Sequence, residues 1–191
     1  MGIRKVKRQA VFLDRDGVLN HSIIRDGKPH PPSDVNELRM VEDAPAALAR
    51  LKEAGFLLIV VTNQPDIARG VTPRAAVDAV NAALGAVLPV DDFFVCWHDD
   101  RNRCECRKPK PGLLLEAAAK YDIDLAQSFL IGDRWRDIDA GAAAGCRIVL
   151  IEYSYREREP AHTPDYRTNS LTAAAAWIIA TSAVHLDRKP T

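Results

Sequence analysis

The stretch that decides the fold is Ala10-Val-Phe-Leu-Asp-Arg-Asp-Gly17, an apolar run that ends on two aspartates and a glycine. Four apolar residues without alternation are typical of a strand that is covered on both faces. Gly17 lets the chain turn past the strand end, so the carboxylate of Asp16 can approach that of Asp14. Two neighbouring carboxylates need a cation or must share a proton, and Mg²⁺ suits such an all-oxygen site. A capped turn is the competing interpretation, because Asp-x-Asp-Gly is common in loops.

Short apolar runs and helical patterns alternate along the rest of the chain. Thr72 is expected to cap a helix, with Pro73 in its first turn. The alternation predicts an α/β fold, a Rossmann-like parallel sheet with helices on both faces. Further strands are predicted at 56–62, 93–97, 128–132 and 147–152, and helices at 44–54, 72–87, 111–121, 135–144 and about 171–180.

Polar side chains follow several of the predicted strands, at the edge where parallel sheets bind their ligands. Asp133 can supply a third carboxylate to the metal, and Asp137, one helical turn later, can orient the ligands. Thr62 and Asn63 can bind phosphate oxygens through a hydroxyl and an amide. The alternatives are a helix cap at Asp133 and a polar turn at Thr62.

Cations precede the predicted helix at 111–121. Lys108 near a transferring phosphoryl group would neutralise the charge that develops in the transition state. Arg107 adds a second cation next to it. A solvated basic loop explains the same residues.

Four metal-binding side chains lie within eleven residues: Cys96, His98, Cys104 and Cys106. That number fills a closed tetrahedral Zn²⁺ site and leaves no position for water, so the predicted zinc is structural. It would fix the loop that leads directly into Arg107 and Lys108. A chance grouping of reduced thiols and a surface histidine is the alternative.

Bulk composition excludes several classes of partner. The chain has 191 residues, 47% of them hydrophobic, and 26 basic residues balance 26 acidic ones. We therefore expect one domain over residues 1–191, with a core at about 10–152 and a tail at 153–191. Zero net charge argues against nucleic-acid binding. The apolar runs are too short for a signal peptide or a membrane span, so we expect a cytoplasmic protein with no membrane partner. We also expect a monomer.

Taken together, these motifs resemble the haloacid dehalogenase superfamily of phosphatases. Its four motifs correspond to Asp14-x-Asp16, Thr62, Lys108 and Gly132-Asp133-x-x-x-Asp137, and the match covers roughly residues 11–150. Within the superfamily, Ile67-Ala-Arg-Gly70 and the zinc loop resemble the D-glycero-D-manno-heptose 1,7-bisphosphate phosphatases. The short loop between His98 and Cys104 instead resembles the related histidinol-phosphate phosphatases.

The resemblance implies a mechanism with an aspartyl-phosphate intermediate. Asp14 would be the nucleophile, and Asp16 would protonate the leaving alcohol and then activate water. The metal set would be Asp14, Asp133 and the main-chain carbonyl of Asp16 for Mg²⁺. Thr62 and Lys108 would position and neutralise the phosphoryl group.

The resemblance also implies substrate contacts. Arg107 would recognise the substrate, and Arg134 stands where these enzymes often carry another basic residue. The leading hypothesis is a sugar-bisphosphate phosphatase that acts on a small phosphorylated metabolite, and a histidinol-phosphate phosphatase is the alternative.

The gaps that could hold a cap are short: about 27 residues follow Asp16 and about 29 follow Asn63, so no large cap domain is expected. An open site leaves a nucleic-acid 3′-phosphatase as a third hypothesis. A catalytically silent, zinc-stabilised binding module is a fourth.

Overall fold

The computed structural model describes residues 7–186, with side chains to residue 182, and the rest of the predicted 1–191 domain lies outside the described residues. Its centre is a six-stranded parallel sheet in the order β5-β4-β1-β6-β7-β8. The strands are β1 Ala10–Leu13, β4 Leu57–Asn63, β5 Asp92–Cys96, β6 Phe129–Gly132, β7 Arg147–Ile151 and β8 Tyr166–Thr168.

The strand order reverses at β1. The chain adds β4 and β5 on one side of β1 and then returns to place β6, β7 and β8 on the other. Leu13 pairs with Val60 of β4 and with Ile131 of β6, so the three strands end close together. Such a reversal opens a crevice beyond the carboxyl ends of the strands, where ligands bind in sheets of this type.

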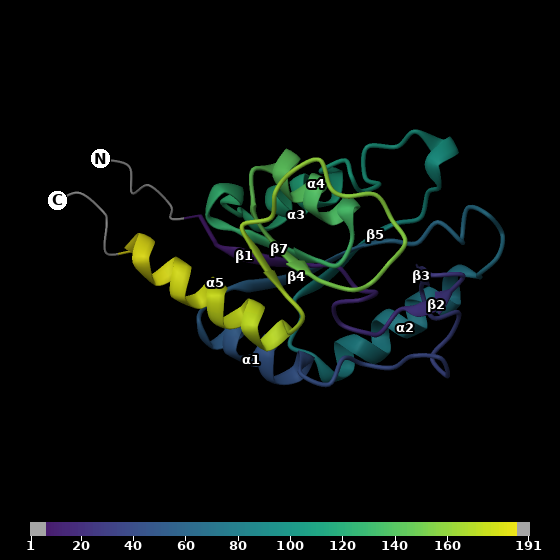
Figure 1. The fold of residues 1–191 in the computed structure, drawn as a ribbon, viewed down its shortest axis with the longest axis horizontal. Helices are drawn as coiled ribbons and strands as arrows, with labels where there is room; N and C mark the ends of the chain where they lie inside the picture. Colours follow the sequence, from purple (N-terminus) through teal and green to yellow (C-terminus); the bar gives the residue numbers. More distant parts are fainter. Residues whose placement is uncertain (1–6, 187–191) are drawn as a thin grey trace.

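Helices cover both faces of the sheet. The helices α1 Ala44–Glu53, α2 Arg74–Val87 and α5 Leu171–Leu186 pack on one face, and α3 Gly112–Tyr121 and α4 Trp135–Ala144 cover the other (Figure 1). Successive residues of β1 contribute alternately to the two faces: Val11 and Leu13 to one core cluster, Ala10 and Phe12 to the other. This is why the strand carries no polar residue until Asp14.

The predicted fold class is confirmed, with some corrections to its elements. α2 begins at Arg74, and Pro73 itself is the N-cap residue, so the expected Thr72 cap is wrong. Pro73 has an extended backbone (ψ 143°), and its carbonyl accepts the first hydrogen bond, from the Ala76 amide at 3.0 Å. No large cap interrupts the described chain; the first gap holds only a hairpin, β2 Ile23–Arg25 and β3 Lys28–His30.

The tail completes the fold, because β8 extends the sheet and α5 buries Leu171, Ala174, Ala175 and Ile178. α5 extends six residues beyond the predicted end. The N-cap residue of α1, Asp43, also caps the first turn of α5: its Oδ2 accepts the Thr172 amide at 2.8 Å and the Ser170 hydroxyl at 3.1 Å. Among the described helices, none combines the length and apolar character needed to cross a membrane.

Candidate active site

The centre of the site is a buried lysine between two buried aspartates. Lys108 Nζ donates to Asp14 Oδ1 at 2.7 Å and to the Val61 carbonyl at 2.7 Å, and lies 2.5 Å from Asp137 Oδ1. These three acceptors match the three protons of an ammonium group. Burial disfavours the charged lysine, but the charges of Asp137 and then Asp14 outweigh it and raise the pKa of Lys108. The lysine is therefore a permanent cation beside Asp14.

Asp14 follows β1 directly, as predicted. Burial raises the pKa of Asp14 to about 7, the Lys108 charge opposes this rise, and the neighbouring carboxylates Asp137 and Asp16 add to it. Its side chain is buried at the bottom of the crevice. One cation is thus too little to neutralise the carboxylates gathered here.

Asp133 is the side chain that most clearly lacks a partner. Within the described residues, neither of its buried carboxylate oxygens has a hydrogen-bond partner of normal geometry. Burial, followed by the charges of Asp14 and Asp137, raises its pKa, while the Tyr155 hydroxyl acts weakly in the opposite direction. Buried polar atoms are almost always satisfied in folded proteins, so these two oxygens are suited to hold a cation.

The carboxylates of Asp14, Asp133 and Asp137 have ligand atoms within 4.8 Å of one another. This donor set consists only of oxygen atoms, the kind that Mg²⁺ prefers. The residues therefore fit the expected ion.

Glycine permits this crowding. Gly17 has φ +96°, and a Cβ placed there would collide with the carboxylate of Asp133. Gly132 is equally close to Asp137, which lies on α4 and accepts the Arg134 amide through Oδ2 at 3.1 Å. The motif glycines thus make room for two carboxylates as well as for the turn.

Asp16 lies at the same pocket, but its carboxylate has other partners. It accepts from Arg15 at 3.1 Å, from Asn20 at 3.0 Å and from Gln64 at 2.8 Å. Arg15 is itself fully buried and donates to Asn81 of α2 at 2.9 Å. The Asp16 side chain is not in the group of three carboxylates, so only its main-chain carbonyl is left for the metal role expected from the sequence.

The residues at the end of β4 differ in what they contact. Thr62 is buried, lines the pocket and accepts from Gln64 Nε2 at 3.0 Å. Asn63 exchanges two hydrogen bonds with the main chain of Lys108, donating to its carbonyl at 3.0 Å and accepting its amide at 3.1 Å. Asn63 therefore positions Lys108, a contact that the sequence did not indicate.

A pocket of about 230 Å³ opens above these residues. Its rim carries four arginines, and each of them is in an ion pair. Arg107 Nε donates to Asp100 at 2.8 Å, and Arg134 pairs with Glu157 of the segment that follows β7. The predicted arginines therefore line the crevice together with Arg69 of the Ile67–Gly70 motif, Arg136 and the hairpin residues Lys28–His30.

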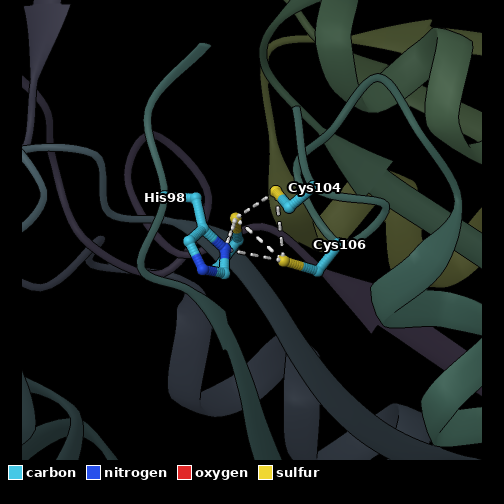
Figure 2. Close-up of side chains that lie close together, drawn as sticks. His98, Cys104 and Cys106 are labelled. Carbon is cyan, nitrogen blue, oxygen red and sulfur yellow. Dashed lines mark hydrogen bonds between the residues drawn. The ribbon is translucent and has the colours of Figure 1, made fainter. Parts of the chain in front are cut away.

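The four predicted metal ligands come together at the end of β5 and in the loop that follows it. Cys106 Sγ lies 3.2 Å from Cys96 Sγ, 3.4 Å from Cys104 Sγ and 3.3 Å from His98 Nδ1, and the two other sulfurs are 3.7 Å apart (Figure 2). Sulfur atoms about 2.3 Å from a tetrahedral zinc would lie about 3.8 Å apart. Burial and then the neighbouring thiols raise the pKa of Cys106, so a cation would have to displace its proton. The cluster is therefore a candidate site for one tetrahedral metal ion.

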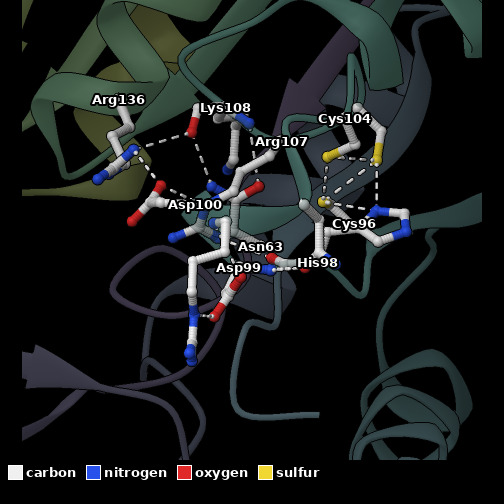
Figure 3. A network of polar contacts seen from close by, with 12 residues as sticks. Asn63, Cys96, His98, Asp99, Asp100, Cys104, Arg107, Lys108 and Arg136 are labelled. Atoms are coloured by element: carbon white, nitrogen blue, oxygen red, sulfur yellow. Dashed lines mark hydrogen bonds and ion pairs between the residues drawn. The ribbon is translucent and has the colours of Figure 1, made fainter. Parts of the chain in front are cut away.

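This cluster is connected to the pocket by a short polar network (Figure 3). Arg107, directly after Cys106, donates to the His98 carbonyl at 3.3 Å and to Asp100. Asn63 holds the next residue, Lys108, from the end of β4. The loop that holds the cluster thus also sets the positions of both cations.

Known proteins with similar sequences belong to one class of phosphatase. A family model described as "HAD-hyrolase-like" matches residues 105–174. The D-glycero-beta-D-manno-heptose-1,7-bisphosphate 7-phosphatase of Bordetella bronchiseptica is 36% identical over 149 residues, covering 74% of this chain and 79% of the relative. The D-glycero-D-manno-heptose-1,7-bisphosphate 7-phosphatase of Thermosynechococcus vestitus is 34% identical and covers 90% of this chain and 95% of its own length.

Solved structures agree with these relatives. A crystal structure of the B. bronchiseptica D,D-heptose 1,7-bisphosphate phosphatase, complexed with magnesium and phosphate, has a TM-score of 0.76 at 31% identity and covers 91% of this chain and 99% of that one. A HAD-like phosphatase from Mesorhizobium loti has a TM-score of 0.74 at 30% identity, with 96% and 91% covered.

Proposed function

This chain belongs to the haloacid dehalogenase-like phosphatases and is a phosphoric monoester hydrolase, and from this premise we propose that it removes the C7 phosphate of D-glycero-D-manno-heptose 1,7-bisphosphate. The observation that carries the proposal is the buried Asp14 carboxylate, which Lys108 holds at the bottom of a crevice with an arginine-lined rim. With the nucleophile at the bottom of the crevice and arginines at its rim, one phosphate of a sugar bisphosphate can react while the other binds to the arginines.

Asp14 supplies the nucleophilic oxygen in this proposal. It attacks phosphorus, the bond from phosphorus to the sugar oxygen breaks, and an aspartyl phosphate forms. Water then attacks the same phosphorus, and the bond to Asp14 breaks to release inorganic phosphate. Lys108 supports both steps because its charge stays next to the transferring group.

Asp16 transfers the proton. It gives a proton to the leaving sugar oxygen in the first step and takes one from the attacking water in the second. Arg15 and Gln64 fix the orientation of its carboxylate at the pocket. Thr62 contributes its hydroxyl to the phosphoryl oxygens from the neighbouring strand end.

Two metal ions complete the proposal. Asp14, Asp133 and the carbonyl of Asp16 would hold Mg²⁺, which would supply positive charge to the phosphoryl oxygens. The unpartnered oxygens of Asp133 support this assignment. Cys96, His98, Cys104 and Cys106 would hold a structural Zn²⁺, and the compact arrangement of their ligand atoms supports it.

Arg107 is the proposed contact to the second phosphate of the substrate. Its side chain is only 10% exposed and lines the crevice, and a guanidinium group can bind two phosphate oxygens at once. Arg134 would add charge from the start of α4, on the same rim. One domain, a monomeric state and a cytoplasmic location remain predictions from the sequence.

The test is phosphate release with Mg²⁺ over a matched panel: both anomers of heptose 1,7-bisphosphate, histidinol phosphate and a 3′-phosphorylated oligonucleotide. We expect one heptose anomer to have the highest kcat/KM, and Asp14→Asn to lower it by on the order of 10³-fold or more. A preference for histidinol phosphate would overturn the proposed substrate and keep the mechanism. Equal activity of Asp14→Asn and the natural protein would overturn the mechanism.

A further inference from the structure

Two arginines from different elements meet at one carboxylate oxygen above the active site. Asp100 Oδ1 lies 2.8 Å from Arg107 Nε and 3.5 Å from Arg136 Nη1 (Figure 3). Arg107 comes from the loop of the metal cluster, whereas Arg136 is the second residue of α4. All three residues line the same pocket as Asp14.

The two arginines are better held than the carboxylate between them. Their side chains are 10% and 24% exposed, while that of Asp100 is 61% exposed. Arg107 donates to the His98 carbonyl at 3.3 Å, and Arg136 donates to the Lys108 carbonyl at 3.4 Å and stacks over Trp135. The cations are therefore fixed in place, and the anion projects from a short 3₁₀ turn, Asp100–Asn102.

The energetics favour replacement of this carboxylate. An ion pair with one partner this exposed is weak, because water screens it. A phosphate offers more charge and more acceptor oxygens than a carboxylate, and two guanidinium groups can bind it through several parallel hydrogen bonds. A phosphate that reaches this position should therefore displace Asp100.

The place between the two arginines also lies next to the site where the reacting phosphate would bind. Lys108 connects the two places directly, since its ammonium group contacts Asp14 and its carbonyl accepts from Arg136. An anion between the arginines is thus adjacent to the phosphoryl site but does not overlap it.

We propose that Arg136 and Arg107 together form the subsite for the second phosphate of the substrate, and that Asp100 occupies this subsite until the substrate displaces it. The inference rests on the proposed sugar-bisphosphate activity and adds Arg136 and Asp100 to it. Arg136 would determine specificity, and Asp100 would act as an internal competitor that a ligand has to displace to place a phosphate between the two arginines.

The first experiment compares the natural protein with Arg136→Met and Asp100→Asn on a heptose 1,7-bisphosphate and on the matched heptose 7-phosphate. We expect Arg136→Met to lower kcat/KM for the bisphosphate by about 10–100-fold, the loss of one charged hydrogen-bonding pair, and to leave the monophosphate within about 2-fold. Asp100→Asn should raise kcat/KM for the bisphosphate by a few-fold. Arg101→Met, an exposed arginine in the same turn that does not line the pocket, is the matched control and should change neither.

Opposite effects of the two variants separate a subsite from a structural ion pair, because loss of a structural pair would lower activity in both. Equal losses on both substrates in Arg136→Met, or a loss in Asp100→Asn, would overturn the inference while the proposed function stands.

The second experiment measures binding without catalysis, by calorimetry with a hexose 1-phosphate in the absence of Mg²⁺. Weaker binding to Arg136→Met and tighter binding to Asp100→Asn support the subsite even if no sugar bisphosphate is hydrolysed. Unchanged binding in both variants overturns it.

Discussion

Gly17→Ala tests whether the close approach of the nucleophile loop to Asp133 is required for catalysis. A methyl group there would have to move the Asp133 carboxylate by about 1 Å or more to restore normal contact, and a shift of that size at an active site can cost about 10²-fold in rate. The positive φ of +96° adds strain of about 1–2 kcal/mol for any residue with a Cβ. The variant therefore combines a general cost in stability with a local cost in metal binding.

Gly55→Ala provides the matched control. Gly55 has a similar φ, +91°, but an added Cβ would meet nothing within 4 Å, so this variant carries the strain without the collision. We expect both variants to lose about 1–2 kcal/mol of unfolding free energy. Only Gly17→Ala should lose kcat, by about 100-fold, and need more Mg²⁺ to reach half its activity. Urea unfolding and phosphate release over a Mg²⁺ titration measure the two effects. Normal activity and Mg²⁺ dependence in Gly17→Ala would refute the reasoning.

Three other perturbations follow from the contacts described above. Cys104→Ser should lower the zinc content and also lower the unfolding free energy by roughly 3–5 kcal/mol. Cys146→Ala, outside the cluster, should keep its zinc. Full zinc content at an unchanged Tm in Cys104→Ser would contradict this prediction. Lys108→Met should abolish phosphate release and cost about 3–5 kcal/mol at pH 8, because Asp14 and Asp137 lose the cation between them; equal stability at that pH would count against it. At Asp43, burial opposes the hydrogen bonds from Thr172 and Ser170, yet these hold the pKa below its usual range. The ionised Asp43 side chain therefore stabilises the fold above pH 4, and this stabilisation is lost as the pH falls through the lower pKa of the folded state. In urea unfolding, Asp43→Asn should lower the unfolding free energy by about 0.5–1 kcal/mol at pH 7 and by less at pH 3. The same loss at both pH values would contradict the assignment.

The catalytic end of the sheet could be predicted because parallel strands align their carboxyl ends. If residues 10–13 and 128–132 form neighbouring parallel strands, Asp14 and Asp133 lie at the same edge of the sheet, wherever the intervening helices pack. The metal cluster could also be predicted, because its four ligands lie close together in the sequence. Neither inference needed knowledge of how side chains pack.

Pairings between distant residues could not be predicted in this way. The cap of α5 joins Asp43 to a residue 129 positions later, and no local pattern connects them. Asp16 bonds to its own neighbour Arg15 because Asn81 of α2 orients that arginine, a fact that depends on the packing of α2. Arg136 reads as an ordinary helix residue until the loop with Asp100 is placed over it. The sequence thus indicated the candidate reacting groups and one orienting residue, Asp137, but not the other side chains that orient them.

The most direct test of the account is to locate the phosphoryl group on the enzyme. Asp16→Asn lacks the base that activates water, so with an aryl phosphate, whose leaving group needs no proton from the enzyme, the aspartyl phosphate should form and accumulate. After acid quenching, we predict that peptide mass spectrometry finds one added phosphoryl group on Asp14 and none in Asp14→Asn. Phosphate release from the natural protein with no phosphorylated Asp14 in the quenched variant would contradict the central claim that Asp14 is the nucleophile.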